Sequence, residues 1–112
     1  MKKAYRVKKN EDFGAIIRAR HSAANHAFVV YVRPNEIGHA RVGVSVSKKR
    51  GKAHTRNLIK RQVRMMVQHV FNLQESYDYV VIVRDGFLEG TFADNEAKLR
   101  KAYEKSKKRM GT

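Results

Sequence analysis

Residues 45–64 constrain the fold and the binding partners of this chain most. They are strongly basic, and their hydrophobic pattern changes from that of a strand to that of a helix. The start alternates as a strand does, Gly51 marks a turn, and the rest follows a helical period, with Thr55 or a residue just before it as the expected cap. Apolar residues then recur on one side of the expected helix, which we predict packs on the domain. This stripe consists of Ile59, Val63, Met66, Val67 and Val70.

The neighbouring face of the same helix is basic. No Asp or Glu occurs between Glu36 and Glu75, so no acidic residue at helical spacing neutralises it. Guanidinium groups bind phosphate oxygens through paired hydrogen bonds, and an amide among them can contact a sugar hydroxyl or a base edge. We therefore predict a polyanionic partner; the alternative is a basic face that meets only water. This face carries Arg56, Asn57, Lys60, Arg61, Arg64 and Gln68.

Length and charge narrow the class of protein. The 112 residues predict a single domain, 1–112, with one core. A formal charge of +15 favours nucleic acid or an anionic membrane surface as partner, and the lack of cysteine excludes disulfides and thiolate metal sites. No segment has the roughly 18 apolar residues of a membrane span, and the N-terminus lacks a signal peptide's apolar part. We expect a cytoplasmic protein.

The remaining pattern predicts an α+β sandwich in which helices cover one face of a sheet. Residues 1–9 form a basic arm with little periodicity, a candidate for a segment that orders only on a partner. Asn10 is the expected N-cap of the first helix. We expect helices over residues 10–20, 55–71 and 95–109, a loop over residues 20–25, and strands over residues 27–33, 40–47 and 78–83.

One face of the predicted strand 40–47 consists of Gly43, Ser45 and Ser47. These residues have little bulk with which to bury a helix, and they leave backbone and hydroxyl groups open to an extended ligand strand. An ordinary solvent-exposed face is the alternative.

The sequence offers no set of residues for bond cleavage by the protein itself. The five histidines have no HExxH or other paired metal-ligand spacing, and no phosphate-loop pattern surrounds Gly51. Asp78 and Asp85 flank a strand and are candidates for holding a cation, although carboxylates at strand ends are common. We therefore predict no catalytic and no metal-ligating residues.

Four segments carry a resemblance to a known family. They are KKNEDF at residues 8–13, SAANHAFVVYV at 22–32, RVGVSVSKK at 41–49, and RNLIKRQVR at 56–64, which fits the signature R-N-x-x-K-R-x-x-R. The chain resembles the bacterial ribonuclease P protein component nearly end to end. The resemblance implies an αβββαβα two-layer sandwich with an unusual left-handed βαβ crossover, like the second domain of small-subunit ribosomal protein five.

The resemblance also implies a function. The family's enzyme is an endoribonuclease that removes the 5′ leader from precursor tRNA, with catalysis by its RNA subunit and Mg²⁺ held mainly by that RNA. The implied partners are the catalytic RNA and precursor tRNA, with no membrane and no obligate protein partner. A ribosomal-type structural RNA-binding protein is the alternative, and it would show no preference for leader-bearing tRNA.

Two groups of site residues follow. For the catalytic RNA, the resemblance implies contacts by the signature helix and the cations that adjoin it: Lys48, Lys49, Lys52, Arg56, Asn57, Lys60, Arg61 and Arg64. For the leader, the resemblance and the open strand face together indicate Phe13, Ile17, Tyr31, Ser45 and Ser47. The chain departs from the family at Leu58, where a basic residue is common, and at Ile17, where an aromatic residue often lines the cleft.

Overall fold

A four-stranded sheet forms the middle layer of the computed structural model, which describes residues 1–110. The main elements are α1 (Asn10–Arg18), β1 (Ser22–Ala24), β2 (Phe28–Pro34), β3 (Arg41–Ser45), α2 (Ala53–Val70), β4 (Tyr77–Val83) and α3 (Phe92–Arg109). Three short 3-10 turns, η1 (Lys3–Tyr5), η2 (Lys48–Arg50) and η3 (Asp85–Glu89), complete the described part of the chain. This order confirms the predicted αβββαβα succession and the α+β class.

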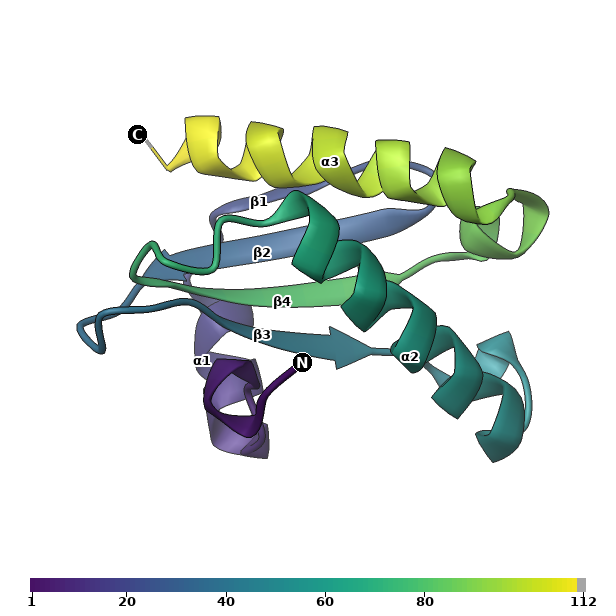
Figure 1. Ribbon diagram of the computed structural model, residues 1–112, viewed down its shortest axis with the longest axis horizontal. Helices are drawn as coiled ribbons and strands as arrows, with labels where there is room; N and C mark the ends of the chain where they lie inside the picture. The colour runs from purple at the N-terminus through teal and green to yellow at the C-terminus, as the bar shows by residue number, and fades with distance from the viewer. Residues whose placement is uncertain (111–112) are drawn as a thin grey trace.

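The sheet has the strand order β1-β2-β4-β3. β4 pairs antiparallel with β2 and parallel with β3, so the chain must cross over between β3 and β4. In Figure 1 both strands run towards the right, α2 crosses in front of the sheet, and β4 lies above β3. This is a left-handed βαβ crossover, as the resemblance implied.

The core on one face of the sheet lies under α2 and α3. It includes the five apolar residues of the α2 stripe, together with Leu99, Ala102 and Tyr103 of α3. From the sheet, Tyr79, Val81 and Val83 of β4 face this core. The stripe predicted from periodicity is therefore confirmed as the packing face of α2.

Helix α1 lies on the opposite face, so the expectation that helices cover only one face is wrong. Ile16 of α1 is fully buried against Val80 of β4, and Phe13 and Ile17 are half-buried around them. Figure 1 shows α1 behind the sheet, while α2 lies in front of it. The physical reason is that β4 has apolar side chains on both faces of the sheet, and both must be buried from water by other elements.

A short strand, β1, occupies half of the segment that we expected to be a loop. Its residues Ser22, Ala23 and Ala24 pair antiparallel with Tyr31, Val30 and Val29 of β2. Small residues have low intrinsic strand propensity. The segment forms a strand because it pairs with β2 and packs against α3. Arg20, with φ of 65°, makes the turn between α1 and β1.

The helix boundaries differ from the predicted caps by a few residues. Lys9 and Lys52 occupy the N-cap positions of α1 and α2, and neither makes a capping hydrogen bond through its side chain. Helix α3 begins three residues before the predicted Asn95, because Thr91 and Asp94 form a capping box.

The N-terminal arm packs on the sheet edge without any partner. The amide of Val7 donates a hydrogen bond to the carbonyl of Val42 at 3.2 Å, and the Val7 side chain is buried. The burial of this apolar side chain explains the docking. Among residues 1–110, no helix is both long and apolar enough to cross a membrane.

Candidate nucleic-acid interface

The outer face of α2 presents the predicted basic residues. Asn57 and Arg61 are exposed, while Arg56, Lys60 and Arg64 are half-buried. Within residues 1–110 none of these cations forms an ion pair with a carboxylate. The face is therefore available to an external anion.

A groove runs along this face and brings together residues from the helix and from the arm. Asn57, Lys60, Arg61 and Arg64 line it from α2, next to Met65 and Gln68. Met1 and Arg6 line it from the arm. Four of the eight residues predicted to contact the catalytic RNA thus share one concave surface, which we call the helix groove.

The other predicted RNA contacts lie around the start of α2. Lys48 and Lys49 are exposed in η2, and Lys52 is exposed at the N-cap of α2. Arg56 follows one turn later, with its Nε buried and without a hydrogen-bond partner among the described residues. The structure places these four cations outside the residues that line the helix groove, at the same end of the helix.

A second concave surface lies between α1 and β3, and we call it the cleft. Phe13 and Ile17 line it from α1, Ser45 lines it from β3, and Lys60 lines it from α2. Tyr31 is half-buried on the same face of the sheet, in the cluster that contains Phe13 and Ile17. Ser47 is exposed at the N-cap of η2 and is not brought into the cleft.

The strand face of Gly and Ser is only partly open. Phe13 lies over Gly43, and a Cβ at that position would be 2.5 Å from Cζ of Phe13. Val7 covers the glycine from the other side, with its Cβ at 3.1 Å. The expected open face is therefore wrong at Gly43, which serves to seat the aromatic ring, while Ser45 remains half-exposed in the cleft.

The helix groove and the cleft are connected. A third hollow, the junction, lies between them and is lined by Arg6, Val7, Phe13, Lys60 and Arg64. Lys60 contributes to all three surfaces, and Phe13 contributes to the junction and the cleft. One continuous surface thus carries members of both predicted groups of site residues.

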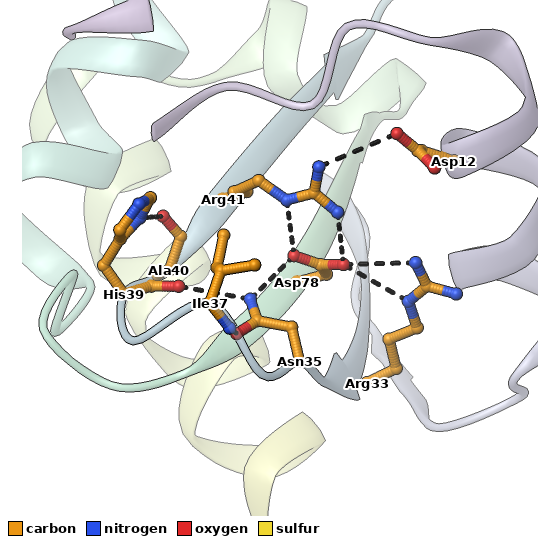
Figure 2. A network of polar contacts seen from close by, with 8 residues as sticks. All are labelled: Asp12, Arg33, Asn35, Ile37, His39, Ala40, Arg41 and Asp78. Carbon is orange, nitrogen blue, oxygen red and sulfur yellow. Dashed lines mark hydrogen bonds and ion pairs between the residues drawn. The ribbon is translucent and has the colours of Figure 1, made fainter. Parts of the chain in front are cut away.

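A buried carboxylate holds the sheet end next to this surface. Asp78 of β4 is fully buried and accepts hydrogen bonds from Arg41 Nε and Nη2 at 3.0 and 2.8 Å. Arg33 Nη2 and Asn35 Nδ2 also donate to it, at 3.2 and 2.8 Å. Figure 2 shows these donors converging on the carboxylate from β2, β3 and the turn between them.

The same network reaches α1. Arg41 Nη1 lies 3.7 Å from the carboxylate of Asp12, so Arg41 links α1 to the sheet one residue before Phe13 (Figure 2). Burial alone would raise the pKa of Asp78, but hydrogen bonds from Arg41, Asn35 and Arg33 outweigh it and lower the pKa. Asp78 and Asp85 do not form a shared cation site, because Asp78 binds these arginines and Asp85 pairs with Arg50.

Sequence reasoning missed Arg6 as a residue of this surface. It lies in an arm without periodicity, and the few apolar residues of the arm, Val7 among them, are the only signal that the arm docks. Arg6 and Arg64 line the same groove, so the arm and the helix bring two guanidinium groups together, and burial and the neighbouring charge of Arg6 lower the pKa of Arg64.

Comparisons with known proteins agree with this geometry. A sequence model of the family Ribonuclease P matches residues 1–107. The ribonuclease P protein component of Streptococcus thermophilus is 47% identical over 94 residues, which are 84% of this chain and 85% of that protein. The solved structure of the Staphylococcus aureus RNase P protein is 42% identical with a TM-score of 0.80, covering 91% of this chain and 94% of that one.

A more distant solved structure shows the same fold. The RNase P protein from Thermotoga maritima is 34% identical, with a TM-score of 0.73, and covers 84% of this chain and 90% of that chain. Sequence and fold therefore agree over most of the molecule, and the chain belongs to the ribonuclease P protein family.

Proposed function

We propose that this chain is the protein subunit of ribonuclease P, which binds a catalytic RNA through the outer face of α2 and binds the 5′ leader of precursor tRNA in the cleft. Membership of the family supports this proposal. The observation that carries it is the shared position of Lys60, which lines both the basic helix groove and the apolar cleft. A chain built this way contacts two RNA segments at once.

The chemistry of the surface suits single-stranded RNA. Phe13 and Tyr31 offer aromatic rings, and stacking on a base contributes about 1–3 kcal/mol per base without selecting its sequence. Cations beside the rings bind the phosphates between the bases. A protein that binds 5′ leaders of many different sequences needs this combination of aromatic rings and cations.

Hydrolysis is assigned to the RNA subunit in this proposal. The carboxylates next to the surface, Asp12 and Asp78, are held by Arg41, and a carboxylate bound to guanidinium is a poor ligand for Mg²⁺. These residues therefore do not fit a protein-held magnesium site, and we assign Mg²⁺ mainly to the RNA. The protein's own contribution is to neutralise phosphates and to position the leader.

Reconstitution tests the proposal. The purified chain is added to a bacterial ribonuclease P RNA at low Mg²⁺, and cleavage of precursor tRNA is measured with and without protein. We expect the protein to restore leader removal and to increase affinity for precursor over mature tRNA. A structural RNA-binding protein would bind both tRNA forms equally and would leave cleavage unchanged.

A matched pair of variants locates the leader. Tyr31→Ala should reduce affinity for precursor tRNA by about tenfold, from the loss of one stacking contact, and should leave mature tRNA unaffected. Tyr77→Ala is the control, because Tyr77 is also half-buried but packs on the opposite face, under α3. Equal losses for precursor and mature tRNA in Tyr31→Ala would exclude Tyr31 from the leader site.

A further inference from the structure

Five cations line the junction: Lys3 and Lys8 at exposed positions of the arm, and a group of three that comes from two distant parts of the chain. Arg6 comes from the N-terminal arm, and Lys60 and Arg64 come from successive turns of α2. All three line both the junction and the helix groove. Their side chains therefore surround the boundary between the two hollows.

Nothing within the domain neutralises this group. In residues 1–110, Arg6, Lys60 and Arg64 form no ion pair and no side-chain hydrogen bond, and Arg6 Nε is buried without a partner. The positive charge of Arg6 also lowers the pKa of Arg64, after the effect of burial. Like charges held this close repel one another, and a bound anion would relieve the repulsion.

The position of Arg6 is set by the sheet. Its backbone bridges Val42 in parallel, and the next amide, Val7 N, donates to the carbonyl of Val42 at 3.2 Å. Val7 is buried beside Phe13 and Gly43. The backbone of Arg6 is therefore already in place, so only the side chain loses conformational entropy when it binds a ligand.

The lining of the junction is also partly apolar. Phe13, Val7, Val42 and Val44 line the same hollow as Arg6, Lys60 and Arg64. A nucleotide of single-stranded RNA presents an unstacked base and a phosphate side by side, whereas duplex RNA keeps its base faces inside the helix. The mixed wall matches the single-stranded form.

We propose that Arg6, at the boundary where Lys60 and Arg64 also line the helix groove, binds one backbone phosphate of the 5′ leader, at the nucleotide whose base contacts Phe13. This inference rests on the proposed function and adds a leader-binding residue from the N-terminal arm. Arg6 supplies the guanidinium that can bind two phosphate oxygens at once, and Lys60 and Arg64, which also line the helix groove, add positive charge beside it.

A double-mutant cycle with the substrate tests the contact. Precursor tRNAs are made with one uncharged 2′-O-methyl methylphosphonate linkage at successive leader positions, each with a 2′-O-methyl phosphodiester control. Dissociation constants are measured with the reconstituted enzyme, using Ca²⁺ in place of Mg²⁺ to suppress cleavage. With unmodified precursor, Arg6→Gln should weaken binding by about tenfold, the effect of one hydrogen-bonded charge contact.

The cycle should show coupling at one leader position. There, the methylphosphonate should weaken binding to the unsubstituted protein by about tenfold and binding to Arg6→Gln by clearly less, because the part of the contact that Arg6 makes is already lost. Arg6→Lys should recover part of the affinity, since it keeps the positive charge but loses the planar guanidinium that can bind two phosphate oxygens at once. Arg100→Gln, an exposed arginine of α3, is the matched control and should bind as the unsubstituted protein does.

Two results would overturn the inference while leaving the proposed function intact. The first is leader-dependent binding by the unsubstituted protein with no effect of Arg6→Gln. The second is an equal loss for precursor and mature tRNA, which would place Arg6 on the catalytic RNA instead. If the unsubstituted protein shows no leader preference at all, the proposed function itself fails. Circular dichroism of each variant verifies folding.

Discussion

The ring of Phe13 occupies the space that a side chain at Gly43 would fill, with Cζ and Cε1 at 2.5 and 2.6 Å from the position of a Cβ. Helix α1 and strand β3 approach closely because residue 43 has no side chain. The glycine therefore determines where the aromatic ring of the cleft lies.

We expect Gly43→Ala to displace Phe13 and to destabilise the fold by about 1–3 kcal/mol, the usual cost of overpacking a well-filled site. Urea denaturation measures this loss. Gly14→Ala is the control: its added methyl meets only the flexible end of Arg18, and alanine favours a helix interior by about 1 kcal/mol over glycine. Equal stabilities of the two variants would contradict the packing of Phe13 on Gly43.

Asp78→Asn should destabilise the protein at neutral pH by on the order of 3–5 kcal/mol, because Arg33 and Arg41 would lose their shared buried anion. The folded-state pKa of Asp78 is lowered, so its contribution is fully present above the ordinary carboxyl value and is lost as the pH falls through the folded value. The difference between the two proteins should therefore shrink below about pH 4.

Chemical denaturation at a series of pH values measures this dependence. Glu36→Gln is the matched control, since Glu36 is exposed in the turn between β2 and β3. A stability difference for Asp78→Asn that stays constant from pH 7 to pH 3 would show that the charge of Asp78 does not stabilise the fold.

The sequence predicted those features that depend on local periodicity. The apolar stripe from Ile59 to Val70 is buried as expected, because a helix with one apolar side can bury only that side. The basic face follows from the same geometry. β4 was also predictable, since an apolar run on both sides of a strand indicates a central position.

Features that depend on tertiary pairing were not predictable in the same way. β1 contains only Ser22, Ala23 and Ala24, and becomes a strand because β2 offers it an edge. The side on which α1 packs depends on how the chain turns at Arg20, which periodicity does not encode. Arg6 lies at the candidate site because its backbone forms a bridge with Val42, a residue far away in the chain.

Leu58 offers a test of the departure from the family signature. It is 47% exposed on α2, next to Asn57, so a longer cation fits there without repacking. Leu58→Arg should tighten binding to the catalytic RNA and steepen the log-log salt dependence by about 0.7–0.9, the effect of one more neutralised phosphate. Leu58→Gln is the control, because it removes the apolar side chain without adding charge. An unchanged slope in Leu58→Arg would place residue 58 outside the RNA interface.

Arg61 and Arg64 test the interface as a whole, because they lie in the middle of the helix groove and no carboxylate within residues 1–110 pairs with them. Arg61→Ala and Arg64→Ala should each weaken binding to the catalytic RNA and flatten the log-log salt dependence by about 0.7–0.9. Affinities measured between 50 and 200 mM salt, roughly the range in which such contacts are most visible, give the slopes. Arg100→Ala, at an exposed position of α3, should leave both affinity and slope unchanged. If both α2 variants behave like Arg100→Ala, the basic face of α2 does not contact RNA. The connection of the helix groove to the cleft through Lys60 would then not serve to bind two RNA segments.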